Sequence, residues 1–140
     1  DEEAFCFTYG DGLSDINIKE LYQHHLNSNA LATLSAVFAP GRFGALSISE
    51  DRVTSFKEKP LGDNSRINGG FFVLNKKVID LIDSDETIWE KSPLENLSQN
   101  NQLAAYLHDG FWQPMDTLRD KMYLSELWKN QEAPWKIWND

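Results

Sequence analysis

Two aspartates that lie far apart in the sequence could together hold a divalent cation. Asp11 stands between two glycines, directly after the apolar run FCFTY at residues 5–9. Asp116 lies in the segment FWQPMDT at residues 111–117. Two carboxylates that meet in a fold repel each other unless a cation or a shared proton lies between them. The pair therefore points to a divalent-metal site if the fold brings the two residues together.

The apolar run before Asp11 predicts a buried strand whose last residues reach the edge of a sheet. Open α/β sheets bind ligands beyond the carboxyl ends of their strands, and glycines let a ligand approach the backbone closely. A lone Gly-Asp-Gly triplet is also typical of an ordinary turn. The strand that precedes this triplet favours the site over the turn.

Other residues carry groups that bind sugars and phosphates. Glu58 and Lys59 follow a predicted strand and offer a carboxylate for sugar hydroxyls and an ammonium for a phosphate. The alternative is an exposed hairpin edge with alternating charge. Asn68 stands before a glycine pair, so it either offers an amide to a sugar hydroxyl or marks a bulge or turn. Gly44 either leaves a gap in a strand or offers its backbone to a ligand.

The remaining residues exclude several classes of chemistry. No Ser/His/Asp arrangement, zinc-ligand spacing or glycine-rich phosphate loop of the usual spacing stands out. His24 and His25 are adjacent on a predicted helix, so they point in different directions and are both expected at the surface. A net charge of −9 argues against a nucleic-acid-binding surface, which needs a basic patch. A nucleotide substrate remains compatible, because a metal and a few local cations can neutralise its phosphates.

Length and composition are typical of a single domain. The chain has 140 residues, and 41% of them are hydrophobic, which is enough for a core. Its only cysteine, Cys6, cannot form an internal disulfide, as is typical of a reducing compartment, and its place in a predicted strand predicts a buried thiol. No apolar run approaches the ~20 residues that span a bilayer, and the acidic first residues are unlike a signal peptide. We therefore expect a cytoplasmic protein with no membrane partner.

The elements that position these residues follow from periodicity and from capping and breaking residues. Helices are predicted over 15–29, 76–82, 87–100 and 116–129, and strands over 5–9, 31–39, 43–48, 52–57, 66–74 and 103–107. Ser14 or Asp15 can cap the first helix, and Pro93 suits a first helical turn. This order predicts an α/β fold with a mixed, mostly parallel sheet, flanking helices and an inserted β-hairpin. If a preceding half is missing, the first strand leaves an exposed edge and apolar faces.

Five segments in this order resemble the sugar-1-phosphate nucleotidyltransferase family: FCFTYGDG, GRFGALSI, VTSFKEKP, INGGFFVLN and GFWQPMDTLRDK. Each segment alone is weak, but the five lie in register over essentially all 140 residues. The GDG triplet and the FWQPMDTLRDK stretch with its PWK tail favour the cytidylyl branch of the family. The resemblance implies a partial nucleotidyltransferase domain of Rossmann-like type.

The resemblance also implies a reaction and a role for each candidate residue. Members of this branch join glucose 1-phosphate to the cytidylyl group of CTP, which gives CDP-glucose for bacterial deoxysugars, O-antigen and lipopolysaccharide. Asp11 and Asp116 would hold Mg²⁺ between the nucleotide and the sugar phosphate. The other implied contacts to substrate come from Thr8, Tyr9, Gly10, Gly44, Glu58, Lys59, Asn68 and Gly69. Members of this type are oligomers, so a homo-oligomer is implied as well.

One feature of the family is not in this sequence: the glycine-rich loop and the following lysine that cradle the triphosphate. The 140 residues therefore resemble the C-terminal part of the family's domain, and we expect the chain alone to be inactive. Two other interpretations stay open: a truncated relative that binds a sugar phosphate without transferring a nucleotide, and a structural piece with no ligand. The two aspartates favour the enzyme over the structural piece, because a scaffold gains nothing from two adjacent carboxylates.

Overall fold

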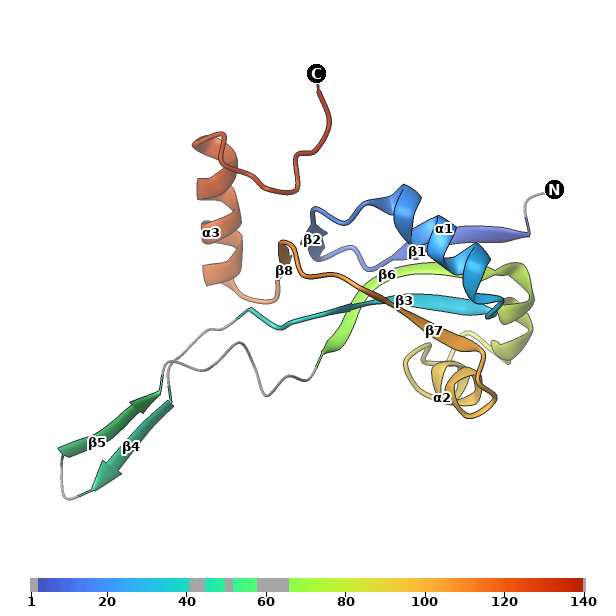
Figure 1. Ribbon diagram of the computed structural model, residues 1–140, viewed down its shortest axis with the longest axis horizontal. Helices are drawn as coiled ribbons and strands as arrows, with labels where there is room; N and C mark the ends of the chain where they lie inside the picture. The colour runs from blue at the N-terminus through green and yellow to red at the C-terminus, as the bar shows by residue number, and fades with distance from the viewer. Residues whose placement is uncertain (1–2, 41–44, 50–51, 58–65, 140) are drawn as a thin grey trace.

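A computed structural model describes residues 3–40, 45–49, 52–57 and 66–139, and it describes side chains for 3–40 and 66–139 (Figure 1). Along the chain the elements are β1 (Ala4–Thr8), β2 (Gly12–Ser14), α1 (Ile18–Ser28), β3 (Ala32–Val37), β4 (Ala45–Ser49), β5 (Arg52–Lys57), β6 (Ile67–Asn75), the 3₁₀ helix η1 (Lys76–Leu81), α2 (Ser92–Gln99), β7 (Leu103–Leu107), β8 (Trp112–Pro114) and α3 (Leu118–Lys129). Strands and helices therefore alternate through most of the described chain.

Four strands form the central sheet in the order β1-β6-β3-β7. β6 runs antiparallel to both β1 and β3, while β3 and β7 are parallel, so β1, β3 and β7 share one direction. This arrangement confirms the predicted mixed sheet. β4 and β5 form a separate antiparallel pair between β3 and β6 in the sequence, which confirms the inserted hairpin.

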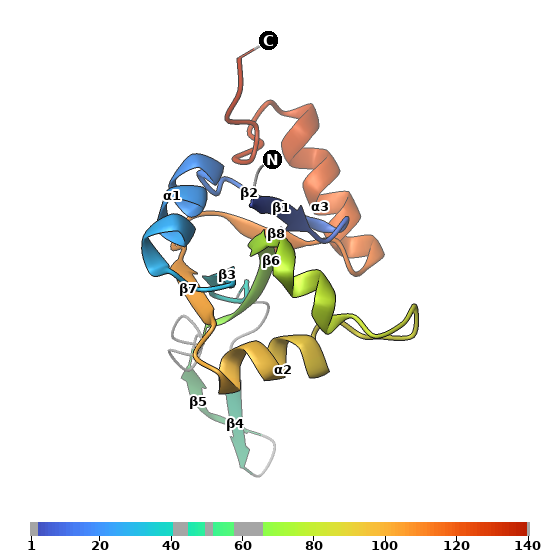
Figure 2. The same cartoon turned by 90° about the vertical axis from the view of Figure 1, so that its right-hand side faces the viewer.

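Helices cover both faces of the sheet (Figure 2). Successive residues of a strand point to opposite faces, and β6 divides its apolar side chains in this way. Phe72 and Leu74 pack in one buried cluster, which also holds Leu97 of α2. Val73 packs in the other buried cluster with Leu21 of α1. Phe72 and Val73 are 1% and 0% exposed, so burial of each side chain contributes roughly 1.5–3 kcal/mol.

α1 begins later than the predicted helix over 15–29 because a different residue caps it. The side-chain oxygen of Asn17 accepts hydrogen bonds from the backbone N–H groups of Lys19 at 3.1 Å and Glu20 at 3.3 Å, which is the usual N-cap arrangement. The predicted caps, Ser14 and Asp15, instead contact a histidine of the β7–β8 loop. Tertiary contacts therefore decide which polar residue caps this helix.

Two further predicted helices take a different form. The segment predicted to be helical over 87–100 is helical only in α2, with Pro93 in its first turn as expected. The segment predicted over 76–82 is the 3₁₀ helix η1, which the side chain of Asn75 caps. β2 and β8 are not predicted from the sequence, because strands of three residues each are too short to carry a period.

The prediction of a buried cysteine is wrong, since Cys6 is exposed. β1 is an edge strand of the four-stranded sheet, and β6 is its neighbour. The side chains of Phe5 and Phe7 are 37% and 39% exposed, so apolar side chains of β1 remain uncovered. The expected exposed edge with apolar faces is therefore present, and it explains why Cys6 is accessible.

His25 is the second residue whose burial the sequence analysis predicts wrongly. Its side chain is buried rather than at the surface, and its Nδ1 lies 2.9 Å from Oγ1 of Thr33 in β3. Burial lowers the pKa of His25, and the neighbouring His24 lowers this pKa further. A neutral imidazole with a hydroxyl partner can be buried without an unpaired charge, so His25 belongs to the core.

The C-terminal tail folds back on α3 through aromatic contacts. The ring of Trp135 lies 5.6 Å from the ring of Phe111 and stacks on Trp128 at 6.5 Å. These contacts connect the tail to both α3 and the loop before β8. With 12 residues, α3 is the longest of the described helices, and none of them is long and apolar enough to cross a membrane.

Candidate functional site

The fold brings the two candidate metal ligands to one place. β2 pairs with β8, with Gly12 opposite Pro114, and the backbone N–H of Met115 donates to the carbonyl oxygen of Asp11 at 2.7 Å. Asp116 is the next residue, so it follows directly on the position that pairs with Asp11. Figure 1 shows β2 beside β8, with α3 starting just after β8. This short strand pair therefore joins two segments that are far apart in the sequence.

A capping box holds Asp116 at the start of α3. The hydroxyl of Thr117 accepts a hydrogen bond from the backbone N–H of Asp120 at 3.2 Å. In return, Oδ2 of Asp120 accepts from the backbone N–H groups of Thr117 at 3.0 Å and Asp116 at 3.2 Å. The buried carboxylate of Asp120 also accepts from Nε2 of Gln113 at 3.3 Å. These bonds fix the backbone on both sides of Asp116, while its own carboxylate stays exposed.

The two exposed carboxylates have the chemistry of a Mg²⁺ site. Mg²⁺ prefers oxygen ligands and is usually held by one or two carboxylates together with substrate phosphates and water. Within residues 3–40 and 66–139, no hydrogen bond or ion pair occupies the carboxylate of Asp11 or of Asp116. The same residues contain no cluster of three or more His, Cys, Asp or Glu side chains. The pair would therefore supply two ligands, and the remaining ligands would come from substrate and water.

A polar cluster at the end of β1 lies next to Asp11 in the chain. Nδ2 of Asn68 donates a hydrogen bond to the hydroxyl oxygen of Tyr9 at 3.2 Å, and Oδ1 of Asn68 accepts from the backbone N–H of Gly70 at 2.9 Å. The Tyr9 ring packs edge-on against Phe72 at 5.8 Å. The carboxyl end of β1 and the start of the antiparallel strand β6 thus lie side by side at one end of the sheet's strands, where a ligand is expected.

Glu90 joins this cluster, although the sequence analysis does not single it out. The pKa of Tyr9 is raised from 10.0 to about 12, mainly by burial and also by a hydrogen bond to Glu90, while the bond from Asn68 opposes the shift. The ring of Trp89 contacts Phe72 at 5.9 Å, which places the neighbouring Glu90 at the cluster. In sequence, Glu90 lies within a segment that reads as a polar helix, so no local signal distinguishes it.

Titration of Tyr9 tests this placement. Because its folded-state pKa lies above the unfolded value of 10.0, the stability that Tyr9 contributes is complete below pH 10 and is lost as the pH rises toward 12. We expect a late ultraviolet titration near pH 12 that disappears in Tyr9→Phe. Burial and Glu20 also raise the pKa of Tyr106, so Tyr106→Phe serves as the control. A Tyr9→Phe variant that keeps the phase near pH 12 would contradict the placement.

Trp112 connects the metal-ligand segment to the strand that carries Asn68. Its indole Nε1 donates to the backbone carbonyl of Gly69 at 2.8 Å, so β8 is tied to β6. A Cβ at Gly69 would lie 2.7 Å from Cγ1 of Val37 and 3.0 Å from the carbonyl oxygen of Ser35. Close packing between β6 and β3 is therefore enough to explain this glycine. β6 carries extra residues here relative to β3, which confirms the bulge interpretation of the glycine pair.

A serine, an aspartate and a histidine do meet in the fold, but not as a catalytic triad. Nε2 of His108 lies 2.9 Å from Oδ1 of Asp15 and 3.3 Å from the hydroxyl of Ser14, which itself donates to the carbonyl of Phe111 at 2.6 Å. In a triad the serine and the carboxylate bond to different ring nitrogens. Here both approach the same nitrogen, so the cluster fastens the end of β2 to the β7–β8 loop.

The other predicted site residues either lie outside the described part of the chain or are exposed near the end of β1. Gly44, Glu58 and Lys59 lie outside the residues whose placement the structure describes. Thr8 is exposed at the end of β1, where its hydroxyl donates to the carbonyl of Tyr9 at 3.3 Å. A Cβ at Gly10 would meet no atom within 4 Å, so the backbone there is open to an incoming ligand.

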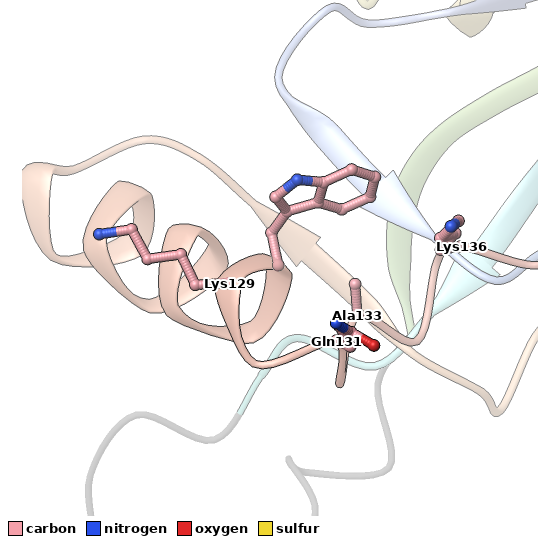
Figure 3. Close-up of a pocket in the computed structure, with 5 residues that line it drawn as sticks. Lys129, Gln131, Ala133 and Lys136 are labelled. Atoms are coloured by element: carbon pink, nitrogen blue, oxygen red, sulfur yellow. The ribbon is translucent and has the colours of Figure 1, made fainter.

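A separate open cavity lies at the far end of α3 (Figure 3). Its volume is about 640 Å³, and it is lined by Trp128, Lys129, Gln131, Ala133 and Lys136. Nζ of Lys136 lies 5.9 Å from the centre of the Trp128 ring. The 12 residues of α3 span roughly 18 Å, so this cavity and Asp116 stand at opposite ends of the helix. None of the predicted site residues lines it.

Comparison with protein families and with curated proteins gives a consistent result. The nucleotidyl transferase family matches residues 1–140. The chain is 59% identical over 138 residues to the glucose-1-phosphate cytidylyltransferase of Salmonella typhi and covers 54% of that protein's length. It is 38% identical over 138 residues to the probable glucose-1-phosphate cytidylyltransferase of Bacillus subtilis, again over 54% of its length. The chain therefore spans about half the length of the curated relatives that it matches.

Solved structures share the fold. HddC from Yersinia pseudotuberculosis superposes with a TM-score of 0.63 over 91% of this chain and 56% of the other, at 23% sequence identity. At this level of identity the likeness concerns the arrangement of strands and helices. It agrees with the predicted sheet and its flanking helices.

Proposed function

Because the chain belongs to the nucleotidyl transferase family, we propose that the protein containing it transfers a cytidylyl group from CTP to glucose 1-phosphate. The products are CDP-glucose and pyrophosphate. The names of the curated relatives contain glucose 1-phosphate and the transfer of a cytidylyl group, which supports this choice of substrates. The structural observation that carries the proposal is the meeting of Asp11 and Asp116, next to the polar cluster of Tyr9 and Asn68.

The reaction requires two phosphate groups to approach each other. An oxygen of glucose 1-phosphate attacks the α-phosphorus of CTP, a P–O bond forms, and the P–O bond to the departing pyrophosphate breaks. Mg²⁺ bound by Asp11 and Asp116 would neutralise charge on both phosphates. The chain holds these carboxylates in place before substrate arrives, because the β2–β8 pair and the capping box fix their backbones. Positioning and charge neutralisation are thus its main contributions.

We assign the sugar ring to the polar cluster at the end of β1. One Nδ2 hydrogen of Asn68 bonds to Tyr9, and its amide has a second hydrogen that can bond a sugar hydroxyl. Thr8, Gly10 and Gly69 lie on the same two strand ends and complete the proposed pocket. Gly44, Glu58 and Lys59 are assigned to it by the family resemblance, with Lys59 on the sugar phosphate.

We also propose a place for this chain in a longer protein, a use for the product, a compartment and an oligomeric state. We take residues 1–140 as the C-terminal part of a nucleotidyl transferase domain, with the triphosphate-binding loop elsewhere in a longer protein. The proposed product supplies deoxysugars for O-antigen and lipopolysaccharide, and the proposed site of action is the cytoplasm. A single cysteine supports a reducing compartment. Self-association into a homo-oligomer is part of the same proposal.

The isolated chain separates binding from transfer. We expect the 140-residue chain to bind glucose 1-phosphate with Mg²⁺ at millimolar concentration and to release no pyrophosphate when CTP is added, because the triphosphate loop is not in its sequence. Isothermal titration calorimetry and a pyrophosphate assay measure the two properties. Asn68→Ala is the control that should weaken the binding of the sugar phosphate. Pyrophosphate release by the chain alone, or no heat with millimolar ligand, would contradict this assignment.

A further inference from the structure

α3 carries an apolar face that nothing covers within the described residues. Leu118, Met122 and Tyr123 are 72%, 65% and 45% exposed, while Leu124 on another side of the helix is 4% exposed. A shallow hollow of about 490 Å³ runs along this surface and is lined by Leu118, Arg119, Met122, Tyr123 and Glu126, which we call the α3 face. Figures 1 and 2 both show α3 at the periphery of the molecule. An exposed apolar surface of this kind marks an interaction site.

The charged residues of the α3 face are placed symmetrically about its apolar centre. Residues three and four apart lie side by side on a helix, so Arg119, Met122, Tyr123 and Glu126 form one stripe. Arg119 lies three residues before Met122, and Glu126 lies three residues after Tyr123. The midpoint of the stripe therefore falls between Met122 and Tyr123, with one cation and one anion at equal distances on either side.

This symmetry selects one partner and one orientation. Two copies of α3 packed antiparallel about a two-fold axis through the midpoint set Arg119 opposite Glu126 of the second copy, and this pair occurs twice. Met122 then faces Tyr123 of the second copy, a favourable contact between sulfur and an aromatic ring. A parallel pair would place Arg119 against Arg119 and Glu126 against Glu126. The stripe is therefore self-complementary only in the antiparallel arrangement.

We propose that the α3 face binds a second copy of this chain as an antiparallel helix pair about a two-fold axis. The inference rests on the self-association in the proposed function, for which it names the surface and the geometry. It needs neither CTP nor glucose 1-phosphate. A failed dimerisation test therefore leaves the proposed reaction standing, and a failed transferase assay leaves the proposed interface standing.

The geometry also places the two candidate metal sites relative to each other. Asp116 lies six residues before Met122, which corresponds to roughly 10 Å along the helix axis from the proposed two-fold. In an antiparallel pair the two Asp116 residues lie on opposite sides of that axis. The two sites therefore flank the proposed interface, and contacts of α3 in the dimer reach the helix turn that holds each Asp116.

A pair of charge reversals tests the interface. We expect the wild-type chain to dimerise with a dissociation constant of about 1–100 μM, as suits a small interface. In a homodimer of Arg119→Glu, or of Glu126→Arg, both charge pairs become repulsive, so each variant alone should dimerise about tenfold or more weakly. An equimolar mixture of the two variants should recover dimers, because the mixed pair again has opposite charges at both positions. Sedimentation equilibrium measures all four samples.

Two additional variants serve as a charge control and as a test that changes no charge. Lys121→Glu reverses a charge on α3 outside the α3 face and should dimerise like the wild type. Met122→Ser removes the central apolar contact without changing any charge and should weaken the dimer, so the test does not depend on the charge reversals alone. Circular dichroism checks that each variant keeps its helices.

The sedimentation results distinguish the antiparallel α3 pair from its alternatives. Loss of dimers in both reversed variants and their return in the mixture support the antiparallel pair. A wild-type chain that is monomeric at 100 μM overturns it. Association that is the same in every variant also overturns it, and would assign self-association to another surface, such as the exposed edge of β1.

Discussion

Replacement of Asp116 by asparagine is expected to lower CDP-glucose formation about a thousandfold in a full-length protein that contains this chain. The physical reason is the loss of one of two carboxylates that fit Mg²⁺, since a metal stabilises the charge of phosphoryl transfer by several kcal/mol and a tenfold rate change corresponds to about 1.4 kcal/mol. Asp11→Asn should have a similar effect. Initial rates of pyrophosphate release at saturating Mg²⁺ measure both variants.

The controls for this prediction separate chemistry from folding. Asp85→Asn removes an exposed carboxylate from a loop and should leave the rate unchanged. Because no described group pairs with the carboxylate of Asp116, the unfolding midpoint of Asp116→Asn should equal or exceed that of the wild type. The double variant Asp11→Asn/Asp116→Asn should be little slower than either single variant, because residues that act as a unit are not additive. An Asp116→Asn rate within tenfold of the wild-type rate would contradict the assignment of Asp116 as a Mg²⁺ ligand.

The sequence predicts both ends of this site but not the contact between them. The strand before Asp11 is a short apolar run and the helix after Asp116 carries periodic apolar residues, so both can be recognised locally. The pairing of β2 with β8 rests on a few backbone hydrogen bonds between strands of three residues each. Backbone bonds of this kind leave no trace in side-chain pattern. The proximity of the Asp11 and Asp116 segments therefore becomes visible only in three dimensions.

The two wrong burial predictions have one cause. Cys6 lies in an apolar strand and His25 in a polar stretch of helix, so local pattern assigns the first to the core and the second to the surface. The structure reverses both, because burial depends on which elements lie alongside. β1 is an edge strand, which exposes Cys6, whereas α1 packs on the sheet and turns His25 toward Thr33. Neighbours distant in sequence decide each case.

Trp112 and Glu90 show what single-residue signals leave out. Trp112 lies in the motif segment FWQPMDTLRDK, but the motif assigns it no role, although its indole bonds to Gly69 and ties the metal-ligand segment to the strand of Asn68. Glu90 reaches Tyr9 only because Trp89 packs on Phe72. Such positions depend on the path of a loop over the sheet. The polar cluster and the metal-ligand segment are therefore held together by residues to which the sequence motifs assign no role.

Gly70→Ala is expected to be the most destabilising single change in the described part of the site. Gly70 has φ of +77°, a conformation that costs an L-residue roughly 1–2 kcal/mol. A Cβ there would overlap Cδ2 of Tyr9, so the ring must also move and weaken its hydrogen bond with Asn68. Together these effects should lower the free energy of unfolding by about 3 kcal/mol or more. Urea denaturation of the 140-residue chain measures the loss.

The chain offers a matched control and a way to locate the strain. Gly10→Ala places the same methyl group where no atom lies within 4 Å, so it should change the free energy of unfolding by no more than about 0.5 kcal/mol. If the Tyr9 ring is the obstacle, the double variant Gly70→Ala/Tyr9→Ala should lose less stability than the sum of the single variants, because the clash is counted only once. Gly70→Ala as stable as Gly10→Ala would mean that the backbone and ring relax freely. Gly70 would then not be needed to seat Tyr9 beside Asn68.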